Sequence, residues 1–172
     1  MKETLYDLKN RRSCRKYLPE QIKDDELNAI LEAGTYAPTG MGRQSPRIIA
    51  VRDKKYRDAI SKLNAEIMGV NSDPYYGAPV IVLVLGDSSV NTYVEDCSCV
   101  LENIMLAAHA KGLSTVWVHR EREIFDSPEG KALLKEWGLP ENLRGVGSVA
   151  LGYATEPAKD AAPRKEGYIT II

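Results

Sequence analysis

The spacing of apolar residues along the chain predicts helices and strands in alternation. Apolar positions that recur every three or four residues are typical of amphipathic helices. Short continuous apolar runs rich in β-branched residues are typical of strands. The helical spacing covers residues 4–10, 24–36, 54–68, 94–111 and 128–137. The strand pattern covers residues 48–51, 79–85, 114–119 and 146–153.

Residues 79–85 differ from the other predicted strands because the whole run is apolar. This pattern predicts a central strand that is covered on both faces. Thr4, Asp24 and Ser127 are residue types that cap helix N-termini, and each stands at the start of a helical pattern. Gly112 fits the cap at the C-terminal end of the helix before it.

Composition indicates one globular domain that spans residues 1–172. The chain has 44% apolar and 27% charged residues, a balance typical of globular proteins. Its net charge of −1 provides no overall basic field for a nucleic-acid backbone. No window approaches the roughly 20 apolar residues of a membrane span, and the N-terminus lacks the apolar core of a secretion signal. We therefore expect a cytoplasmic protein that binds neither nucleic acid nor a membrane.

Cysteine and histidine usage argues against disulfides and metal sites. Cys14, Cys97 and Cys99 are odd in number and have no repeated spacing. His109 and His119 have no partners at metal-ligand spacing. We expect neither a disulfide nor a bound metal.

The highest local charge lies in residues 11–16, which read Arg-Arg-Ser-Cys-Arg-Lys. Guanidinium groups match phosphate oxygens in a bidentate way, and three arginines favour a phosphate over a carboxylate. The same run also fits a solvated basic turn or a contact with nucleic acid. The six residues alone leave these interpretations open.

Two further segments suggest contacts with other molecules. The loop at 38–46 contains two glycines and two prolines, so it can approach a ligand closely and offer backbone donors. The tail from residue 156 is polar, whereas residues 167–172 are apolar again. This apolar end predicts either docking onto a partner subunit or a terminal strand in the chain's own sheet.

Several motifs occur in a characteristic order. They are Arg-Arg-Ser-Cys-Arg at 11–15, Ala-Pro-Thr-Gly at 37–40 with Gln44, Ala-Ala-His-Ala-Lys-Gly-Leu at 107–113, Leu-Gly-Tyr at 151–153 and Pro-Arg-Lys at 163–165. Each motif is weak alone, but together they span nearly the whole chain and resemble the nitroreductase family of FMN oxidoreductases. The resemblance implies an α+β fold with a central mixed sheet flanked by helices. It also implies an intertwined homodimer with two FMN sites shared between the subunits.

The resemblance assigns FMN-binding positions to both ends of the chain. Arg11 and Ser13 match positions that contact the FMN phosphate, with Arg12 beside them. Arg15 matches a basic residue near the pyrimidine edge of the flavin, where a cation stabilises the negative charge of the reduced ring. From the tail, Arg164 or Lys165 is expected to reach the phosphate.

A second set of expected FMN contacts comes from the middle of the chain. These are Pro38, Thr39, Gly40 and Gln44, in the loop that resembles the family's contribution from the other subunit. Asn64 matches an amide that reads the flavin ring, and it equally fits an exposed helical asparagine.

Two features separate this chain from the family pattern or leave its chemistry open. The loop has Gly42 where the family has an asparagine and Ser45-Pro46 where it has Pro-Trp, so ring packing and acceptor choice are open. Residues 119–122 stand where the family places backbone groups near flavin N5 and O4. We interpret the side chains of His119 and Arg120 as solvated, with contact to an acidic acceptor as the alternative.

The resemblance implies that NADH or NADPH donates hydride to flavin N5 and that nitroaromatics, quinones or similar acceptors then take the electrons in a ping-pong reaction. No catalytic side chain is expected, because the cofactor performs the hydride chemistry. One alternative is a flavin-binding storage or sensor protein without turnover, which the altered loop motivates. Another is a phosphate or RNA binder built on the basic cluster alone.

Overall fold

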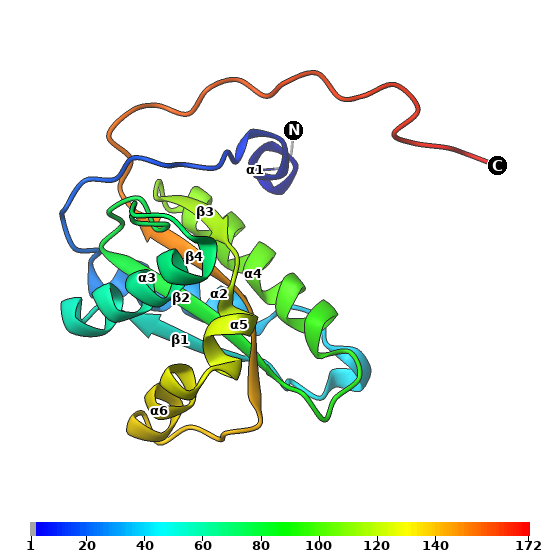
Figure 1. Ribbon diagram of the computed structural model, residues 1–172. Coiled ribbons are helices and arrows are strands. Elements are labelled where there is room, and N and C mark those ends of the chain that lie inside the picture. Colours follow the sequence, from blue (N-terminus) through cyan, green and yellow to red (C-terminus); the bar gives the residue numbers. More distant parts are fainter. Residues whose placement is uncertain (1–2) are drawn as a thin grey trace.

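A computed structural model describes residues 3–172 of the chain (Figure 1). Its centre is a four-stranded sheet, in which neighbouring strands all pair antiparallel in the order β1-β2-β4-β3. The strands are β1 Arg47–Val51, β2 Val80–Asp87, β3 Ser114–Val118 and β4 Leu143–Gly152. All four predicted strands are confirmed. The resemblance implied a mixed sheet, and a parallel pairing occurs at an isolated bridge between Ser13 and Thr115.

Strand β2 is central and covered on both faces, as its continuous apolar run predicted. Val82 and Val84 pack into one core cluster, and Ile81 and Leu83 pack into a second. Alternate residues of a strand point to opposite faces, so a strand between two helical layers must be apolar throughout.

Helices cover both faces of the sheet, which gives the molecule three layers (Figure 1). Residues of α2 and α4 join the core of one face, and residues of α3, α5 and α6 join the core of the other. The helices are α1 Glu3–Asn10, α2 Asp24–Thr35, α3 Lys54–Met68, α4 Tyr93–Ala110, α5 Glu121–Asp126 and α6 Pro128–Glu136. The fold is therefore α+β, and the five predicted helices are confirmed.

The predicted helix caps are partly confirmed. Ser127 accepts a hydrogen bond from the Gly130 amide at the start of α6. Gly112 follows the end of α4 with a φ of +77°, the left-handed conformation that favours glycine. Thr4 and Asp24 are not caps, because Thr4 lies inside α1 and Asp24 is the first residue of α2. An acidic residue in the first turn still complements the positive end of the helix dipole.

Helix α5 was not predicted, and in this segment only the side chains of His119 and Arg120 were interpreted as solvated. His119 and Arg120 are indeed exposed, and Arg120 pairs with Glu123 at 3.0 Å. Glu121, in contrast, is completely buried. The interpretation of His119 and Arg120 as solvated therefore agrees with their exposure, and the burial of Glu121 was not predicted.

After β4 the chain continues as an extended arm (Figure 1). Tyr17 bridges Ala154, and from residue 155 onward the arm forms no helix or strand. A terminal strand in the chain's own sheet is therefore wrong for residues 167–172, whose apolar side chains are exposed. Docking onto a partner subunit stays a prediction. Within residues 3–172, no helix combines the length and apolar character needed to cross a membrane.

Candidate functional site

The basic segment at residues 11–16 lies along the edge strand β3. Ser13 forms its parallel bridge to Thr115, and the Cys14 amide donates to the Thr115 carbonyl at 2.9 Å. The Tyr17 hydroxyl donates to the Cys14 and Ala150 carbonyls at 2.9 and 3.2 Å. These bonds fix the backbone that presents the arginines.

Two arginines of this segment have buried nitrogen atoms without acceptors. Arg12 donates to the carbonyls of Arg11 and Lys9 at 2.5 and 2.6 Å. Nevertheless Nε of Arg12 and Nη1 of Arg11 are buried and meet no hydrogen-bond partner among residues 3–172. A buried charged donor without an acceptor is costly, so an anionic acceptor is expected at each of these atoms.

A cavity of about 560 Å³ adjoins this segment. Arg12, Ser13 and Arg15 line one side of it, and residues 156–160 at the start of the arm line another. Lys16 reaches across to Glu156 at 2.6 Å. The cavity therefore brings together three predicted site residues.

The two basic residues predicted from the tail lie elsewhere. Arg164 and Lys165 are exposed and do not line this cavity, and the guanidinium of Arg164 donates to the Ala162 carbonyl. In a single copy of the chain the structure does not bring them to Arg11.

Arg15 has an aromatic neighbour that the sequence did not indicate. Its guanidinium carbon lies 5.9 Å from the centre of the Tyr76 ring, within the range of a cation–π contact. Tyr76 has a φ of +56°, which is strained for a residue with a large side chain. The ring beside Arg15 therefore belongs to a residue with strained backbone.

The predicted loop at 38–46 is held by Asp96, a buried residue of α4. Its Oδ1 atom accepts from the Gly40 amide at 2.8 Å, and its Oδ2 atom accepts from the Thr92 hydroxyl at 3.2 Å. The Gln44 amide donates to the Thr39 hydroxyl at 3.0 Å. Asp96 was not predicted as a site residue, although an acidic residue beside the apolar face of a buried helix is a usable signal.

The predicted site residues form two groups within one chain. Arg12, Ser13 and Arg15 line the cavity beside β3, whereas Thr39 and Gln44 line a separate cavity of about 270 Å³ between α2, β1 and α4. Figure 1 shows the basic segment and the loop after α2 on opposite sides of the molecule. Within one chain, the two groups of residues therefore do not form a single site.

Asn64 is completely buried, so the expectation of an exposed helical asparagine is wrong. Its Nδ2 atom donates to the Tyr75 hydroxyl at 3.0 Å and to the His119 carbonyl at 2.8 Å. The Tyr75 hydroxyl donates in turn to Glu121 at 2.9 Å. Asn64 therefore links α3 to the end of β3 and to α5.

Comparison with known proteins identifies this architecture. Residues 8–153 match the sequence model of the Nitroreductase family. The chain belongs to the nitroreductase family. A crystal structure of a nitroreductase with bound FMN from Bacteroides fragilis is 34% identical, covers 100% of both chains and has a TM-score of 0.91.

Other relatives also match this chain over most of its length. A nitroreductase with bound FMN from Desulfitobacterium hafniense is 29% identical over 100% of this chain and 99% of its own, with a TM-score of 0.88. A relative from Archaeoglobus fulgidus is 33% identical over 89% of this chain and 86% of its own. It has the provisional name NADH dehydrogenase/NAD(P)H nitroreductase.

Strained backbone occurs at a few positions of the chain. Within the described part of the chain, four residues other than glycine have positive φ. They are Met41 and Gln44 in the loop, Tyr76 beside Arg15, and Arg120 at the end of β3. Such strain persists only where surrounding contacts enforce it, and it is typical of functional segments.

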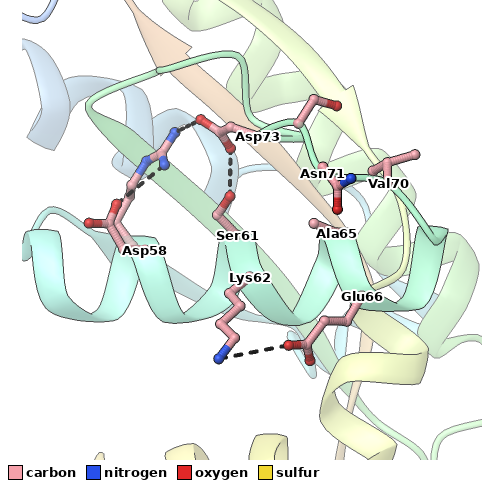
Figure 2. A pocket seen from close by; sticks show the side chains of 10 residues that line it. Asp58, Ser61, Lys62, Ala65, Glu66, Val70, Asn71 and Asp73 are labelled. Carbon is pink, nitrogen blue, oxygen red and sulfur yellow. Dashed lines mark hydrogen bonds and ion pairs between the residues drawn. The ribbon is translucent and has the colours of Figure 1, made fainter.

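A hollow of about 460 Å³ over α3 has a different character (Figure 2). Its polar side chains bind one another, since Asp73 accepts from Arg57 and from Ser61, and Lys62 pairs with Glu66 at 3.8 Å. None of the predicted site residues lines it. The cavity beside residues 11–16 is therefore the candidate active site.

Proposed function

We propose that the protein is an FMN-dependent NAD(P)H oxidoreductase that reduces nitroaromatics, quinones or similar acceptors. The observation that supports it most is the pair of buried, unpaired guanidinium nitrogens of Arg11 and Arg12 beside Ser13. Solved relatives that share the whole fold contain FMN. A phosphate monoester offers the anionic oxygens that these donors lack.

Within this proposal, the chain's own residues bind and tune the cofactor. Arg11, Arg12 and Ser13 hold the phosphate, and Arg164 or Lys165 joins them in the assembled protein. Arg15, braced by Tyr76, places a cation near the flavin and favours its reduced, negatively charged form. When bound, FMN accepts hydride from NADH or NADPH and returns the electrons to the acceptor.

The proposed enzyme is a homodimer, because its two groups of site residues lie apart in one chain. Pro38, Thr39, Gly40 and Gln44 of one copy complete the site of the other. The extended arm supports this assembly, since Tyr168 and Ile169 are 79% and 80% exposed in the single chain. Exposed apolar residues grouped on one segment indicate an interaction surface.

An anaerobic titration tests the proposed activity. Purified protein reconstituted with FMN should be yellow, and it should bleach when NADPH or NADH is added. With menadione present it should oxidise the nucleotide repeatedly, with parallel lines in double-reciprocal plots. A yellow protein without turnover would support the storage or sensor alternative. A protein that does not bind FMN would contradict both the proposed enzyme and this alternative.

A further inference from the structure

A buried polar network joins α5 to the segment that carries Tyr76. Glu121 is completely buried at the start of α5, and its Oε1 atom accepts from the Tyr75 hydroxyl at 2.9 Å and from the Ser148 hydroxyl. Asn64 donates to Tyr75 and also to the His119 carbonyl. Thus α3, α5, β4 and the two segments around residues 75 and 119 share one network.

The network holds two strained backbone positions in place. Tyr75 immediately precedes Tyr76, whose φ is +56° and whose ring lies beside Arg15. The His119 carbonyl immediately precedes Arg120, whose φ is +95°. Glu121 directly follows the strained residue Arg120. Its side chain accepts a hydrogen bond from Tyr75, which directly precedes the strained residue Tyr76. Strained conformations persist only when such contacts over-determine them.

We propose that Glu121 is a positioning residue for the flavin site, because its carboxyl group fixes from behind both the Tyr76 ring under Arg15 and the turn at His119–Arg120. The inference rests on the proposed function. The carboxyl group of Glu121 acts through Tyr75 and the backbone. A change at its carboxyl group should therefore be visible in the flavin itself.

The protonation state of Glu121 is the variable that a titration can change. Burial raises its pKa to about 7, although hydrogen bonds from Ser148 and Tyr75 lower it. Its Oε2 atom and the Oδ1 atom of Asn64 are both buried acceptors that meet no donor in the described residues. Protonation of the carboxyl group turns one of its oxygens from an acceptor into a donor, so it changes the hydrogen bonding of the network.

Charged groups near Glu121 are few. On its own helix, Glu123 raises the pKa of Glu121 and pairs with Arg120. The nearest titratable side chain of another segment is Tyr75, whose pKa is well above its usual value because it is buried. On the elements packed against α5, Arg144 of β4 pairs with Asp126 at the other end of α5, Lys62 of α3 pairs with Glu66, and Glu136 of α6 pairs with Lys55.

The test is the visible spectrum of oxidised FMN bound to the full-length protein, recorded between pH 5 and 9. Wild type should show an inflection near neutral pH. Glu121→Gln keeps the acceptor oxygen and cannot ionise, so it should bind FMN within about threefold of wild type and lose the inflection. Ser148→Ala removes one donor to the carboxylate and should move the inflection up by about half to one pH unit. Glu129→Gln, an exposed change on α6, should leave the inflection in place.

The outcomes separate this inference from the proposed function. Bound flavin with an unchanged inflection in Glu121→Gln, or an inflection that Ser148→Ala does not move, would overturn the inference alone. Wild-type protein that binds FMN but shows no inflection would do the same. Failure of wild-type protein to bind FMN would overturn the proposed function and, with it, this inference.

Discussion

The amide of Gly40 donates a hydrogen bond of 2.8 Å to Oδ1 of Asp96, so a buried carboxylate of α4 holds the glycine of an otherwise exposed loop. A Cβ atom at Gly40 would lie 2.4 Å from the Thr92 hydroxyl oxygen. The loop therefore requires glycine at this position for reasons of space.

Replacing Gly40 with alanine should destabilise the protein by about 1–3 kcal/mol, because the new methyl group overlaps Thr92. Adding Thr92→Ala removes the overlapping hydroxyl and should recover part of this loss. Chemical unfolding of both single variants and the double variant measures the coupling. Fully additive effects would show that Thr92 does not set the space available at Gly40.

Asp96→Ala should cost about 2–3 kcal/mol of unfolding free energy, since the Gly40 amide and the Thr92 hydroxyl both lose their acceptor. Asp96→Asn keeps one acceptor oxygen and should lose less. Denaturant unfolding ranks the two variants, and equal losses would contradict the hydrogen-bond account.

Glu121 should make stability fall as the pH rises. Its pKa is 4.5 ordinarily and about 7 in the folded protein, so folding binds its proton more tightly. The resulting stabilisation, about 3 kcal/mol, is fully present below pH 4.5 and is lost as the pH rises to about 7. Wild type should therefore lose stability relative to Glu121→Gln across this interval. If the free energy of unfolding of the two proteins changed with pH in parallel, the pKa of Glu121 would not be raised in the folded protein.

Asp73 should have the opposite pH dependence. Burial raises its pKa, but hydrogen bonds from Arg57, Ser61 and two backbone amides outweigh burial and leave the pKa below its usual 3.8 (Figure 2). The stabilising contribution of the Asp73 carboxylate is thus present above pH 3.8. It is lost as the pH falls through the pKa that Asp73 has in the folded protein. Asp73→Asn should be less stable than wild type at neutral pH, with a gap that narrows in acid.

The control for this prediction is Glu66→Gln, which removes the partner of Lys62 on the exposed side of α3. A surface ion pair contributes about 0–1 kcal/mol, so this variant should stay close to wild type. If the difference in unfolding free energy between wild type and Asp73→Asn stayed constant down to pH 2, the lowered pKa of Asp73 would be contradicted.

Removal of residues 161–172 should leave the single-chain fold intact, because this part of the arm is exposed and forms no helix or strand. If the arm packs against a second copy of the chain, light scattering should show a dimer for the full chain. The truncated chain should then show a larger monomer fraction. A truncated protein that stays fully dimeric at low micromolar concentration would show that the arm is dispensable for assembly.

Most of the fold could be predicted because its signals are local. The continuous apolar run of β2 requires two covered faces, and the Ser127-Pro128 pair begins α6 where it was expected. Helix α5 was missed because it has six residues and a dense charge pattern that is usual for solvated segments. Burial of Glu121 depends on hydroxyl groups from residues 75 and 148, which no local pattern connects to it.

The candidate site was predictable only in part for a similar reason. Clustered arginines indicated an anion, and Arg12, Ser13 and Arg15 do line one cavity. The support from Tyr76 and Asp96 arises from contacts between distant segments. The exposed tail gave no local indication of where Arg164 and Lys165 act.

The affinity of the Arg11→Gln variant for FMN, measured by quenching of flavin fluorescence, tests the central claim most directly. Loss of a buried charged donor to the phosphate should weaken binding about 10- to 100-fold, and Arg11→Gln combined with Arg15→Gln should weaken it further. Arg52→Gln, which removes a surface arginine paired with Asp24, should bind FMN as wild type does. Unchanged affinity in the Arg11→Gln variant would contradict the account.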